Sequence, residues 1–465
     1  MKRIFALYMA LTLVCGVSEA RKASGVVTSG KERLAGVIVT DGKNFTSTDR
    51  KGRFSFDIED NAEFVYIVTP SGYAADWSSG VPAFYQQAEG KSKFTFDLKR
   101  LGQADDYSII AIADPQTRGD KHFAKFIAAP LDDVCATAGK QEQVAVGLTL
   151  GDISWDTLHM LPKYKAEIVR TGIPFYPVVG NHDHDKEASG DYETTAAYRR
   201  EMGPENYAFR MGKDVVIVVD NIIYRTQKKY DEGYAPHVLE FVKGIVSLLP
   251  QDADIYIAQH ASLYLWDKDR TALNSDELLE ILKGHNVNFV SGHTHINNFY
   301  EYAENVVEHN VAAICGSWWD TVHCTDGTPR GYKVFTVKDG SLSWYYKSVD
   351  YPEDYQVQVF GKGESDLFPE SILVNVWDWD PQWKVEWFED GVAKGELQTV
   401  LALSPIYVKD INAVYASLGE EMPKYKKPRK NFHYFAATPS ESAAKVKVRV
   451  TSRFGQVWEY EVECK

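Results

Sequence analysis

The sequence predicts a three-domain protein in which an α/β domain lies between two β-rich domains. Three observations predict this arrangement. The chain has 465 residues, which is too long for a single hydrophobic core. Its first and last parts consist of short runs in which apolar and polar residues alternate. Its middle part consists of continuous apolar runs separated by helical patterns.

The composition is that of a globular protein. An apolar fraction of 44% and a charged fraction of 25% exclude disordered, coiled-coil and collagen-like chains. The net charge of -14 disfavours nucleic acid and anionic membranes as partners, because both would be repelled. Small anions would be repelled as well, unless a bound metal ion supplied local positive charge. The charge therefore makes metal ligands the first feature to look for.

Residues 1–20 are typical of a secretory signal peptide. Residues 2–3 are basic, residues 4–14 are apolar, and residues 18–20 offer small side chains for cleavage near Ala20. The apolar run is too short to span a bilayer. The residue before Cys15 is valine, where a lipoprotein signal needs a small residue, so lipid anchoring is not expected. We expect a periplasmic or secreted protein without an integral membrane segment.

Four cysteines remain after this cleavage, and their pairing stays open. An oxidising compartment permits disulfides, but buried or free thiols fit the sequence equally well. Their spacing matches no zinc-binding pattern. The four are Cys135, Cys315, Cys324 and Cys464.

Residues 21–103 are expected to form a small antiparallel β-sandwich. Runs such as 53–58 alternate apolar and polar residues, and pairs such as Asp41-Gly42 mark the turns between them. No cluster of titratable residues in this part indicates chemistry of its own.

Residues 104–350 are expected to form the α/β domain. Continuous apolar runs are typical of strands buried on both faces, and helical spacing between them supplies the covering layers. The runs lie at 109–113, 144–150, 175–179, 215–219, 255–258 and 288–291.

Residues 351–465 return to strand-like runs and form the third, β-rich domain. This part is rich in tryptophan. Such residues are more often sandwich core than a carbohydrate-binding platform, and both interpretations stay open for Trp377, Trp379, Trp383 and Trp387.

Polar side chains follow five of the apolar runs at the point where each run ends. Strand ends in an open α/β sheet converge on one edge, so these residues should meet in one small volume. Carboxylate, amide and imidazole groups suit divalent ions such as manganese, iron and zinc. The residues are Asp114 and Gln116, Asp152, Asn181 with His182 and Asp183, His260, and His293 with His295.

Each of these motifs has an ordinary structural explanation when taken alone. An aspartate after a strand is commonly a helix cap, and Gly-Asp and Gly-Asn are common turn pairs. Five in series, including Gly-Asn-His-Asp and Gly-His-Thr-His, make coincidence the weaker account.

In this order and spacing, the motifs resemble those of the calcineurin-like metallophosphoesterase superfamily. The match runs from Ile109 to His295, and the flanking β-domains resemble those of a three-domain bacterial subgroup. The resemblance implies a four-layer αββα sandwich as the catalytic domain, flanked by the two β-rich domains.

The resemblance also implies a role for each residue. Asp114, Gln116, Asp152 and His295 would surround one metal. Asp152, Asn181, His260 and His293 would surround the other, with Asp152 bridging. His182 would be the catalytic histidine, oriented by Asp183. Gln116 departs from the family, whose usual residue there is histidine; an amide oxygen is a weaker ligand than imidazole.

The expected function is that of an exported phosphoesterase with two divalent metals, either manganese, iron, zinc or magnesium. It would hydrolyse a small phosphomonoester or phosphodiester by attack of a hydroxide that bridges the metals. The sequence does not address oligomeric state. Four residues after the last metal motif are candidates to line the substrate pocket, although core tryptophans and a solvated arginine are equally good interpretations: Trp318, Trp319, His323 and Arg330.

The alternative function is a secreted glycan-binding or adhesion protein that keeps a degenerate phosphoesterase core. Gln116 is the single ligand departure that favours it. A protein without bound metal or hydrolysis would support this alternative.

Overall fold

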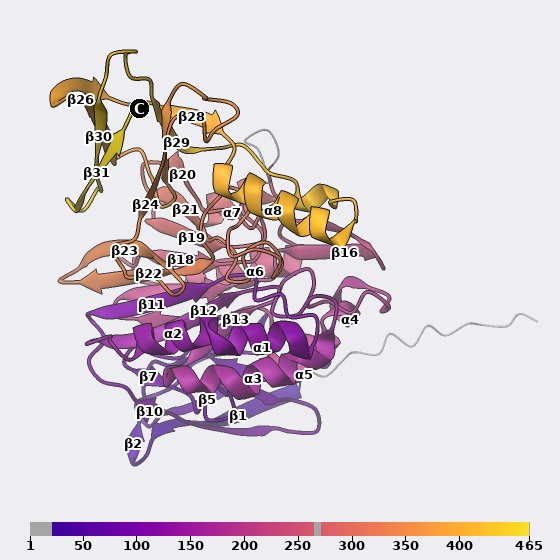
Figure 1. The fold of residues 1–465 in the computed structure, drawn as a ribbon. Helices are drawn as coiled ribbons and strands as arrows, with labels where there is room; N and C mark the ends of the chain where they lie inside the picture. The colour runs from indigo at the N-terminus through magenta and orange to yellow at the C-terminus, as the bar shows by residue number, and fades with distance from the viewer. Residues whose placement is uncertain (1–20, 265–270, 465) are drawn as a thin grey trace, which may run out of the picture.

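The computed structural model describes residues 21–264 and 271–464, so the predicted signal peptide lies outside the described residues. Figure 1 shows three tiers, with the N-terminal strands at the bottom, the central sheets and helices in the middle, and the C-terminal strands with one long helix at the top. Among the described residues, no helix is both long enough and apolar enough to cross a membrane.

The N-terminal tier is built from strands alone. One sheet has the order β2-β1-β5 with β9 beside β1, a second has the order β4-β3-β6-β8, and β7 pairs with β10. Its apolar residues join the central domain in one hydrophobic cluster, in which the rings of Phe84 and Tyr207 lie 4.6 Å apart. The strands are β1 (Arg21–Ser29), β2 (Glu32–Arg33), β3 (Ile38–Thr40), β4 (Phe45–Ser47), β5 (Arg53–Ile58), β6 (Phe64–Ile67), β7 (Tyr73–Ala74), β8 (Tyr85–Gln87), β9 (Lys93–Asp97) and β10 (Lys99–Arg100).

The central domain contains two mixed sheets. The five-stranded sheet has the order β13-β12-β11-β22-β23, in which the first three strands are parallel. Its strands are β11 (Tyr107–Ile112), β12 (Val144–Leu150), β13 (Phe175–Val178), β22 (Gly331–Lys338) and β23 (Ser341–Ser348).

The six-stranded sheet has the order β14-β15-β18-β19-β21-β20, with four parallel strands between two antiparallel edges. Its strands are β14 (Tyr207–Met211), β15 (Asp214–Val218), β18 (Ile255–Ala258), β19 (Val287–Ser291), β20 (Asn298–Ala303) and β21 (Val306–Asn310). A separate hairpin consists of β16 (Ile222–Thr226) and β17 (Lys229–Glu232).

Helices complete the four-layer αββα arrangement that was predicted. They follow the strands of each sheet in sequence, as crossover connections between parallel strands require. The helices are α1 (Asp120–Ala128), α2 (Pro130–Ala138), α3 (Leu161–Ile168), α4 (Asp191–Thr194), α5 (Ala196–Met202), α6 (Pro236–Val246) and α7 (Ser275–Ile281).

The C-terminal tier is a pair of four-stranded sheets around a separate core. The orders are β24-β25-β29-β28 and β27-β26-β30-β31. Trp377 and Trp383 are buried, and Trp383 stacks on Trp458 at 5.6 Å, so these tryptophans belong to the core. The strands are β24 (Val357–Phe360), β25 (Ile372–Val376), β26 (Lys384–Glu389), β27 (Val392–Glu396), β28 (Thr399–Ala402), β29 (Asn431–Ala437), β30 (Lys445–Thr451) and β31 (Val457–Glu463).

One helix of this tier, α8 (Pro405–Leu418), runs across the top of the central domain in Figure 1. Ser404 caps its first turn by accepting a hydrogen bond from the backbone N–H of Tyr407, and Pro405 occupies the first helical position. A short 3₁₀ turn, η3 (Lys424–Lys426), follows α8.

The four cysteines among the described residues are free. Cys315 and Cys324 are buried, whereas Cys135 and Cys464 are partly exposed. The thiol interpretation therefore holds in this structure.

Candidate metal centre

The predicted ligands come from the carboxyl ends of strands in both central sheets. Asp114, Asp152 and Asn181 follow β11, β12 and β13 of the five-stranded sheet. His260 and His293 follow β18 and β19 of the six-stranded sheet. The sequence predicted convergence on one sheet edge, whereas the structure brings the ends of two facing sheets together.

Four of these residues form a compact cage. The Nε2 atom of His260 lies 3.0 Å from Asn181 Oδ1, 3.1 Å from His293 Nδ1 and 3.3 Å from Asp152 Oδ1. Ligand atoms at about 2.1 Å from one metal ion are separated by about 3.0–3.4 Å from each other. The cage therefore has the dimensions of a coordination sphere.

Beside the cage lies a second group of buried donor atoms. Asp114 Oδ1, Gln116 Oε1 and His295 Nε2 have no hydrogen-bond partner among the described residues, although buried polar atoms nearly always have one. His295 Nε2 lies 3.5 Å from Asp114 Oδ1, and Gln116 Nε2 donates to Asp152 Oδ2 at 2.8 Å. These atoms fit a second cation next to the first, with Asp152 between the two.

Each histidine ring is oriented by a contact to the nitrogen that faces away from the site. His260 Nδ1 donates to the carbonyl of Leu150 at 2.7 Å, and His295 Nδ1 donates to the carbonyl of Gly316 at 3.3 Å. His293 Nε2 lies 3.6 Å from the carboxylate of Glu232. Such outer contacts fix the ring and leave the other nitrogen available to a metal.

The cage favours positive charge at His260, whereas burial lowers the pKa of His293. Burial alone would lower the pKa of His260, but the Asp152 carboxylate outweighs it and raises the pKa to about 10. Burial alone would raise the pKa of Asp152, but His260 and His182 bring it well below its usual range. A metal cation placed between these groups would meet the same attractive potential.

The backbone is strained at five of the candidate ligands. These five residues have positive φ angles, which L-residues rarely adopt and which cluster at functional sites. The angles are 51° at Asp114, 41° at Gln116, 50° at Asp152, 69° at His293 and 54° at His295.

Two glycines allow the ligand loops to approach one another. A Cβ atom on Gly180 would lie 2.1 Å from the backbone nitrogen of Asp152. A Cβ atom on Gly151 would lie 2.5 Å from His260 Nδ1, and its φ of 83° is itself unfavourable for other residues. The Gly-Asp and Gly-Asn motifs therefore need glycine at these positions, because any larger residue would clash.

His182 lies at the edge of the cage and is partly exposed. Its Nε2 atom is 4.0 Å from Asp152 Oδ2, and its Nδ1 atom is 2.7 Å from Asp156 Oδ1. Lys186 Nζ lies 2.5 Å from the same oxygen of Asp156. The ring is therefore held by Asp156.

Asp183 was expected to orient His182, but its carboxylate faces the backbone. It accepts hydrogen bonds from the N–H groups of Ile153, Ser154 and Gly180. Burial raises its pKa to about 7, with a further contribution from the Asp152 charge. Asp183 thus joins the two loops that carry Asp152 and Asn181.

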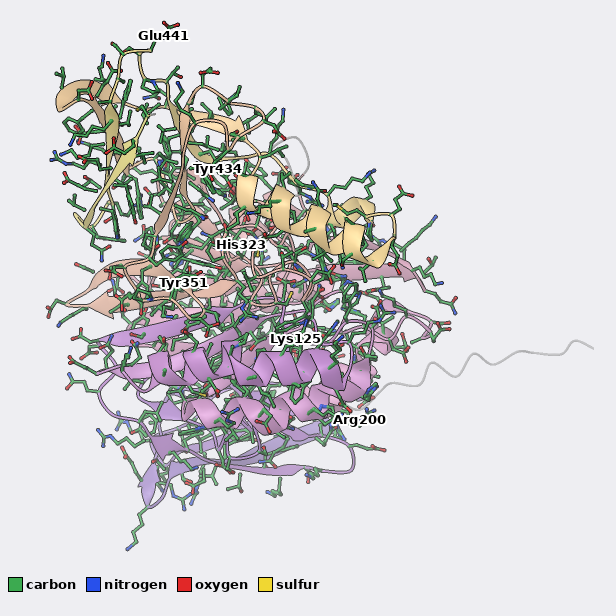
Figure 2. All side chains as sticks on the ribbon, viewed as in Figure 1. Lys125, Arg200, His323, Tyr351, Tyr434 and Glu441 are labelled. Atoms are coloured by element: carbon green, nitrogen blue, oxygen red, sulfur yellow. The ribbon has the colours of Figure 1, made fainter. Side chains whose placement is uncertain are left out.

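The four candidate pocket residues separate into two pairs. The Trp318 ring stacks on His295 at 4.1 Å, and the buried Trp319 donates from Nε1 to the carbonyl of Gln116 at 3.2 Å. His323 Nδ1 lies 3.4 Å from Asp410 of α8, and Figure 2 shows it beneath this helix. Arg330 pairs with Asp350 at 3.2 Å. The tryptophans contact the site, whereas the other two side chains pair elsewhere.

The structure adds residues that the sequence did not single out. Asp156 lies four positions after Asp152, so its place in a ligand loop was a usable signal. Glu232 belongs to the β16–β17 hairpin, and Tyr425 belongs to η3 of the C-terminal domain. Neither stands near a ligand motif in sequence, so only the tertiary fold brings them to the site.

Three family models match consecutive parts of the chain. The model described as N terminal of Calcineurin-like phosphoesterase matches residues 21–101, the model described as Calcineurin-like phosphoesterase matches 107–297, and the model described as C terminal of Calcineurin-like phosphoesterase matches 308–458. The last match begins within β21, before the domain boundary predicted at residue 350.

Solved structures show similarity at low identity. A dimetal phosphatase from Danio rerio is 13% identical, with 52% of this chain and 97% of that chain covered and a TM-score of 0.39. The 5'-nucleotidase from Candida albicans is 13% identical, with 52% of each chain covered and a TM-score of 0.33. A 5'-nucleotidase precursor from Thermus thermophilus is 11% identical, with 52% of this chain and 54% of that chain covered and a TM-score of 0.32.

The matched regions span about half the length of the two nucleotidases. No curated protein sequence matches the chain at a significant level.

Proposed function

Because the chain belongs to the calcineurin-like phosphoesterases with both N- and C-terminal domains, it is a metal-dependent phosphoric ester hydrolase, and we propose that it is an exported enzyme acting on a small phosphoester. The observation that carries this proposal is the pair of adjoining donor groups that share Asp152. One group alone would fit many metal proteins. Two adjoining donor groups that share a carboxylate suit the two metal ions of a phosphoryl-transfer enzyme.

We assign two metal positions. The first is held by Asp114, Gln116, Asp152 and His295, and the second by Asp152, Asn181, His260 and His293. Two divalent cations bound there supply positive charge to the phosphoryl oxygens and to the attacking water. The donors are oxygen and nitrogen atoms without thiolate, which suits manganese, iron or zinc.

We assign His182 as the acid that protonates the leaving oxygen. Asp156 accepts from Nδ1–H at 2.7 Å, which holds the ring and keeps Nε2 directed to the site. Proton donation of this kind contributes about 10²- to 10⁴-fold to the rate. Alkyl phosphoesters need it most, because an alkoxide leaves poorly without a proton.

The substrate site is bordered by an aromatic rim, defined as Trp155, Trp318 and Tyr425. Trp318 and Tyr425 rings lie 4.9 Å apart, and Trp155 and Tyr425 rings lie 6.5 Å apart. The guanidinium of Arg118 lies 5.5 Å from the Trp155 ring. Lys426 Nζ lies 5.8 Å from the Tyr425 ring. Aromatic rings with adjoining cations support a small phosphoester with a flat or apolar leaving group. The net charge of -14 disfavours nucleic acid as the substrate.

Hydrolysis of nitrophenyl phosphate and bis-nitrophenyl phosphate with manganese, zinc or magnesium tests the reaction and separates monoesterase from diesterase. We expect Asp152→Asn to abolish both metal binding and turnover. A wild-type protein that binds no metal and hydrolyses neither ester would instead support the glycan-binding alternative.

The acid is tested with leaving groups of different basicity. We expect His182→Ala and Asp156→Asn to slow ethyl phosphate hydrolysis far more than nitrophenyl phosphate hydrolysis, because nitrophenolate leaves without a proton. The exposed His159→Ala serves as the control and should slow neither. Equal losses on both esters would remove the acid role from His182.

Export rests on the pattern of residues 1–20 and has its own test. The full chain, produced in cells with a secretory pathway, should appear outside the cytoplasm with a mature N-terminus directly after Ala20. Retention of residues 1–20 on a cytoplasmic protein would contradict export and leave the hydrolase activity unaffected.

A further inference from the structure

Residues 316–320, here called the tryptophan loop, contact His295 in two ways. The loop lies between β21 and β22. The carbonyl of Gly316 accepts from His295 Nδ1 at 3.3 Å, and the Trp318 ring stacks on the imidazole at 4.1 Å with an interplanar angle of 16°. The hydrogen bond to Gly316 and the stacked Trp318 ring together fix the orientation of the His295 imidazole.

The same loop also contacts the Gln116 segment. The Trp319 indole N–H donates to the carbonyls of Pro115 and Gln116 at 3.1 and 3.2 Å. Lys125 of α1, labelled in Figure 2, donates to the carbonyl of Trp319 at 2.8 Å. The tryptophan loop therefore contacts two residues of the proposed first metal position, His295 and Gln116.

The backbone of the tryptophan loop is strained at two residues. Trp318 and Trp319 have φ angles of 48° and 68°, and a bulky aromatic residue is strained in this region. Such a conformation persists when surrounding contacts hold it.

The C-terminal domain supplies them through three residues, here called the C-terminal clamp: Tyr407, Tyr415 and Lys426. Lys426 Nζ donates to Asp320 at 2.6 Å, and Tyr415 donates to the same carboxylate at 3.2 Å. The hydroxyls of Tyr407 and Ser317 lie 2.8 Å apart.

The clamp is itself tied together. The Tyr407 hydroxyl donates to the carbonyl of Lys426 at 2.7 Å, which joins α8 to η3. Lys426 is only 6% exposed and Asp320 is partly buried, so their ion pair is less screened by water than a surface pair. Ser317 and Asp320 of the tryptophan loop are thus held by C-terminal residues that lie 90 and 106 positions further along the chain.

We propose that the C-terminal clamp sets the metal affinity of the first position, by holding the tryptophan loop against His295 and Gln116. Lys426 and Tyr407 are positioning residues in this view and touch neither metal nor substrate. The inference rests on the metal assignment proposed above. The second position is oriented by other contacts, from Leu150 and Glu232, so the clamp acts on one position of the two.

The metal affinity of the position that contains Gln116 should depend most on these outer contacts. An amide oxygen is a weaker ligand than imidazole, so its affinity depends more on pre-organised geometry. Loss of outer contacts around a metal site typically lowers affinity about 10- to 100-fold.

Manganese titration of the full-length protein, followed by calorimetry and by electron paramagnetic resonance, tests the proposal. For Lys426→Met we expect the weaker of two manganese equivalents to bind about 10- to 100-fold less tightly, with the other unchanged. The signal of a coupled manganese pair should give way to that of a single ion. Lys426→Arg should restore the pair, because arginine keeps the ion pair with Asp320.

Two further variants separate positioning from general damage. Lys427→Met removes the same charge from the neighbouring exposed lysine and should leave both equivalents unchanged. Tyr407→Phe removes only the hydroxyl, so it should fold even if Lys426→Met does not, and should weaken the same single equivalent.

Each outcome decides a different question. If the wild type binds two manganese ions and both clamp variants bind them equally well, the clamp proposal is wrong and the proposed function stands. If both equivalents weaken together, the clamp is structural only and the proposal is also wrong. If the wild type does not bind two ions, the metal assignment falls and the clamp proposal falls with it.

Discussion

Gln116 gives the proposed first metal position three oxygen donors and one nitrogen donor. Asp114, Gln116 and Asp152 supply the oxygens and His295 the nitrogen. The second position has two of each, from Asp152, Asn181 and two histidines. Oxygen-rich sites suit harder ions such as manganese or magnesium, whereas imidazole suits zinc and iron. The two positions should therefore differ in metal preference.

Replacing Gln116 with histidine should remove this difference, because the first position would then also have two oxygen and two nitrogen donors. We expect Gln116→His to bind zinc or iron more tightly than manganese at the first position, because imidazole replaces an amide oxygen. Elemental analysis after dialysis against equal concentrations of the metals measures the effect. Gln87→His, on an exposed strand position of the N-terminal domain, should keep the wild-type metal content. Unchanged metal content in Gln116→His would show that Gln116 is not a ligand.

Glu308 is a buried acid outside the metal site. Its carboxylate accepts from the backbone N–H of Leu263 and from the hydroxyls of Ser291 and Tyr302. Burial nevertheless raises its pKa to about 7. The folded protein therefore holds a proton that the unfolded chain releases near the ordinary glutamate value.

This proton makes stability depend on pH. A pKa raised by folding stabilises the protein fully below the unfolded value, and the stabilisation is lost as pH rises through about 7. We expect Glu308→Gln to lose less stability than the wild type between about pH 5 and about pH 9. Denaturant unfolding of both proteins over this range measures the difference. Parallel curves would show that Glu308 is charged in the folded state throughout.

Among single residues, the sequence predicted the candidate ligands that directly follow a strand. Asp114, Asp152, Asn181 and the histidines were predicted because their positions follow apolar runs. Asp156 stands four positions after Asp152, so its place in a ligand loop was a signal that the prediction did not use. Glu232 lies on the β16–β17 hairpin, far from His293 in sequence, and no local spacing indicates this contact.

At the level of the elements, the loops that follow β12 and β13 approach each other closely in the site. Gly151 and Gly180 let the two loops pass each other with no room for a methyl group. The carboxylate of Asp183 then joins the loops through three backbone N–H groups. The geometry at Asp152 depends on both features.

Gly180→Ala should disrupt this arrangement. Its Cβ atom would lie 2.1 Å from Asp152 N and 2.3 Å from Asp152 Oδ1, so the loop must shift and the shared carboxylate with it. We expect loss of bound metal and at least a hundred-fold loss of turnover, since displacement of about 1 Å costs about that much. Gly119→Ala, where a Cβ atom meets nothing within 4 Å, is the control. Full metal content in Gly180→Ala would contradict the geometry.

The sequence predicted most elements of the central domain but not their distribution between sheets. The runs at 109–113 and 144–150 correspond to β11 and β12. A run of apolar residues predicts a buried strand without saying which sheet it joins. Family resemblance, rather than periodicity, implied two sheets.

Helix α8 was missed in a region predicted as β-rich. Its isoleucine, valine and tyrosine residues favour strands, although Ser404-Pro405 is a start signal for a helix. The omission matters because α8 carries Tyr407 of the clamp. The part of the site that depends on the C-terminal domain was therefore hidden from the sequence.

For the molecule as a whole, bound metal should link the two central sheets. The proposed ligands come from the ends of both sheets, so a metal ion bound by them would join the sheets only in the folded state. At a free metal concentration of 100 times its dissociation constant, each ion adds about 2.7 kcal/mol of stability. Metal removal should therefore lower the melting temperature by several degrees.

Thermal unfolding in chelator and in excess manganese measures this effect. Asp152→Asn should melt at the same temperature in both conditions, because it removes the carboxylate shared by the two positions. A wild type that melts identically with and without metal would contradict a centre that joins the sheets.

The left-handed backbone at five proposed ligands and two tryptophans has a consequence for protein engineering. Each such residue destabilises the fold by about 1–3 kcal/mol, and glycine adopts the same angles freely. A library selected only for heat resistance in chelator would therefore accumulate glycine at the ligand positions and lose catalysis. Directed evolution of a more durable form needs a screen for turnover in every round.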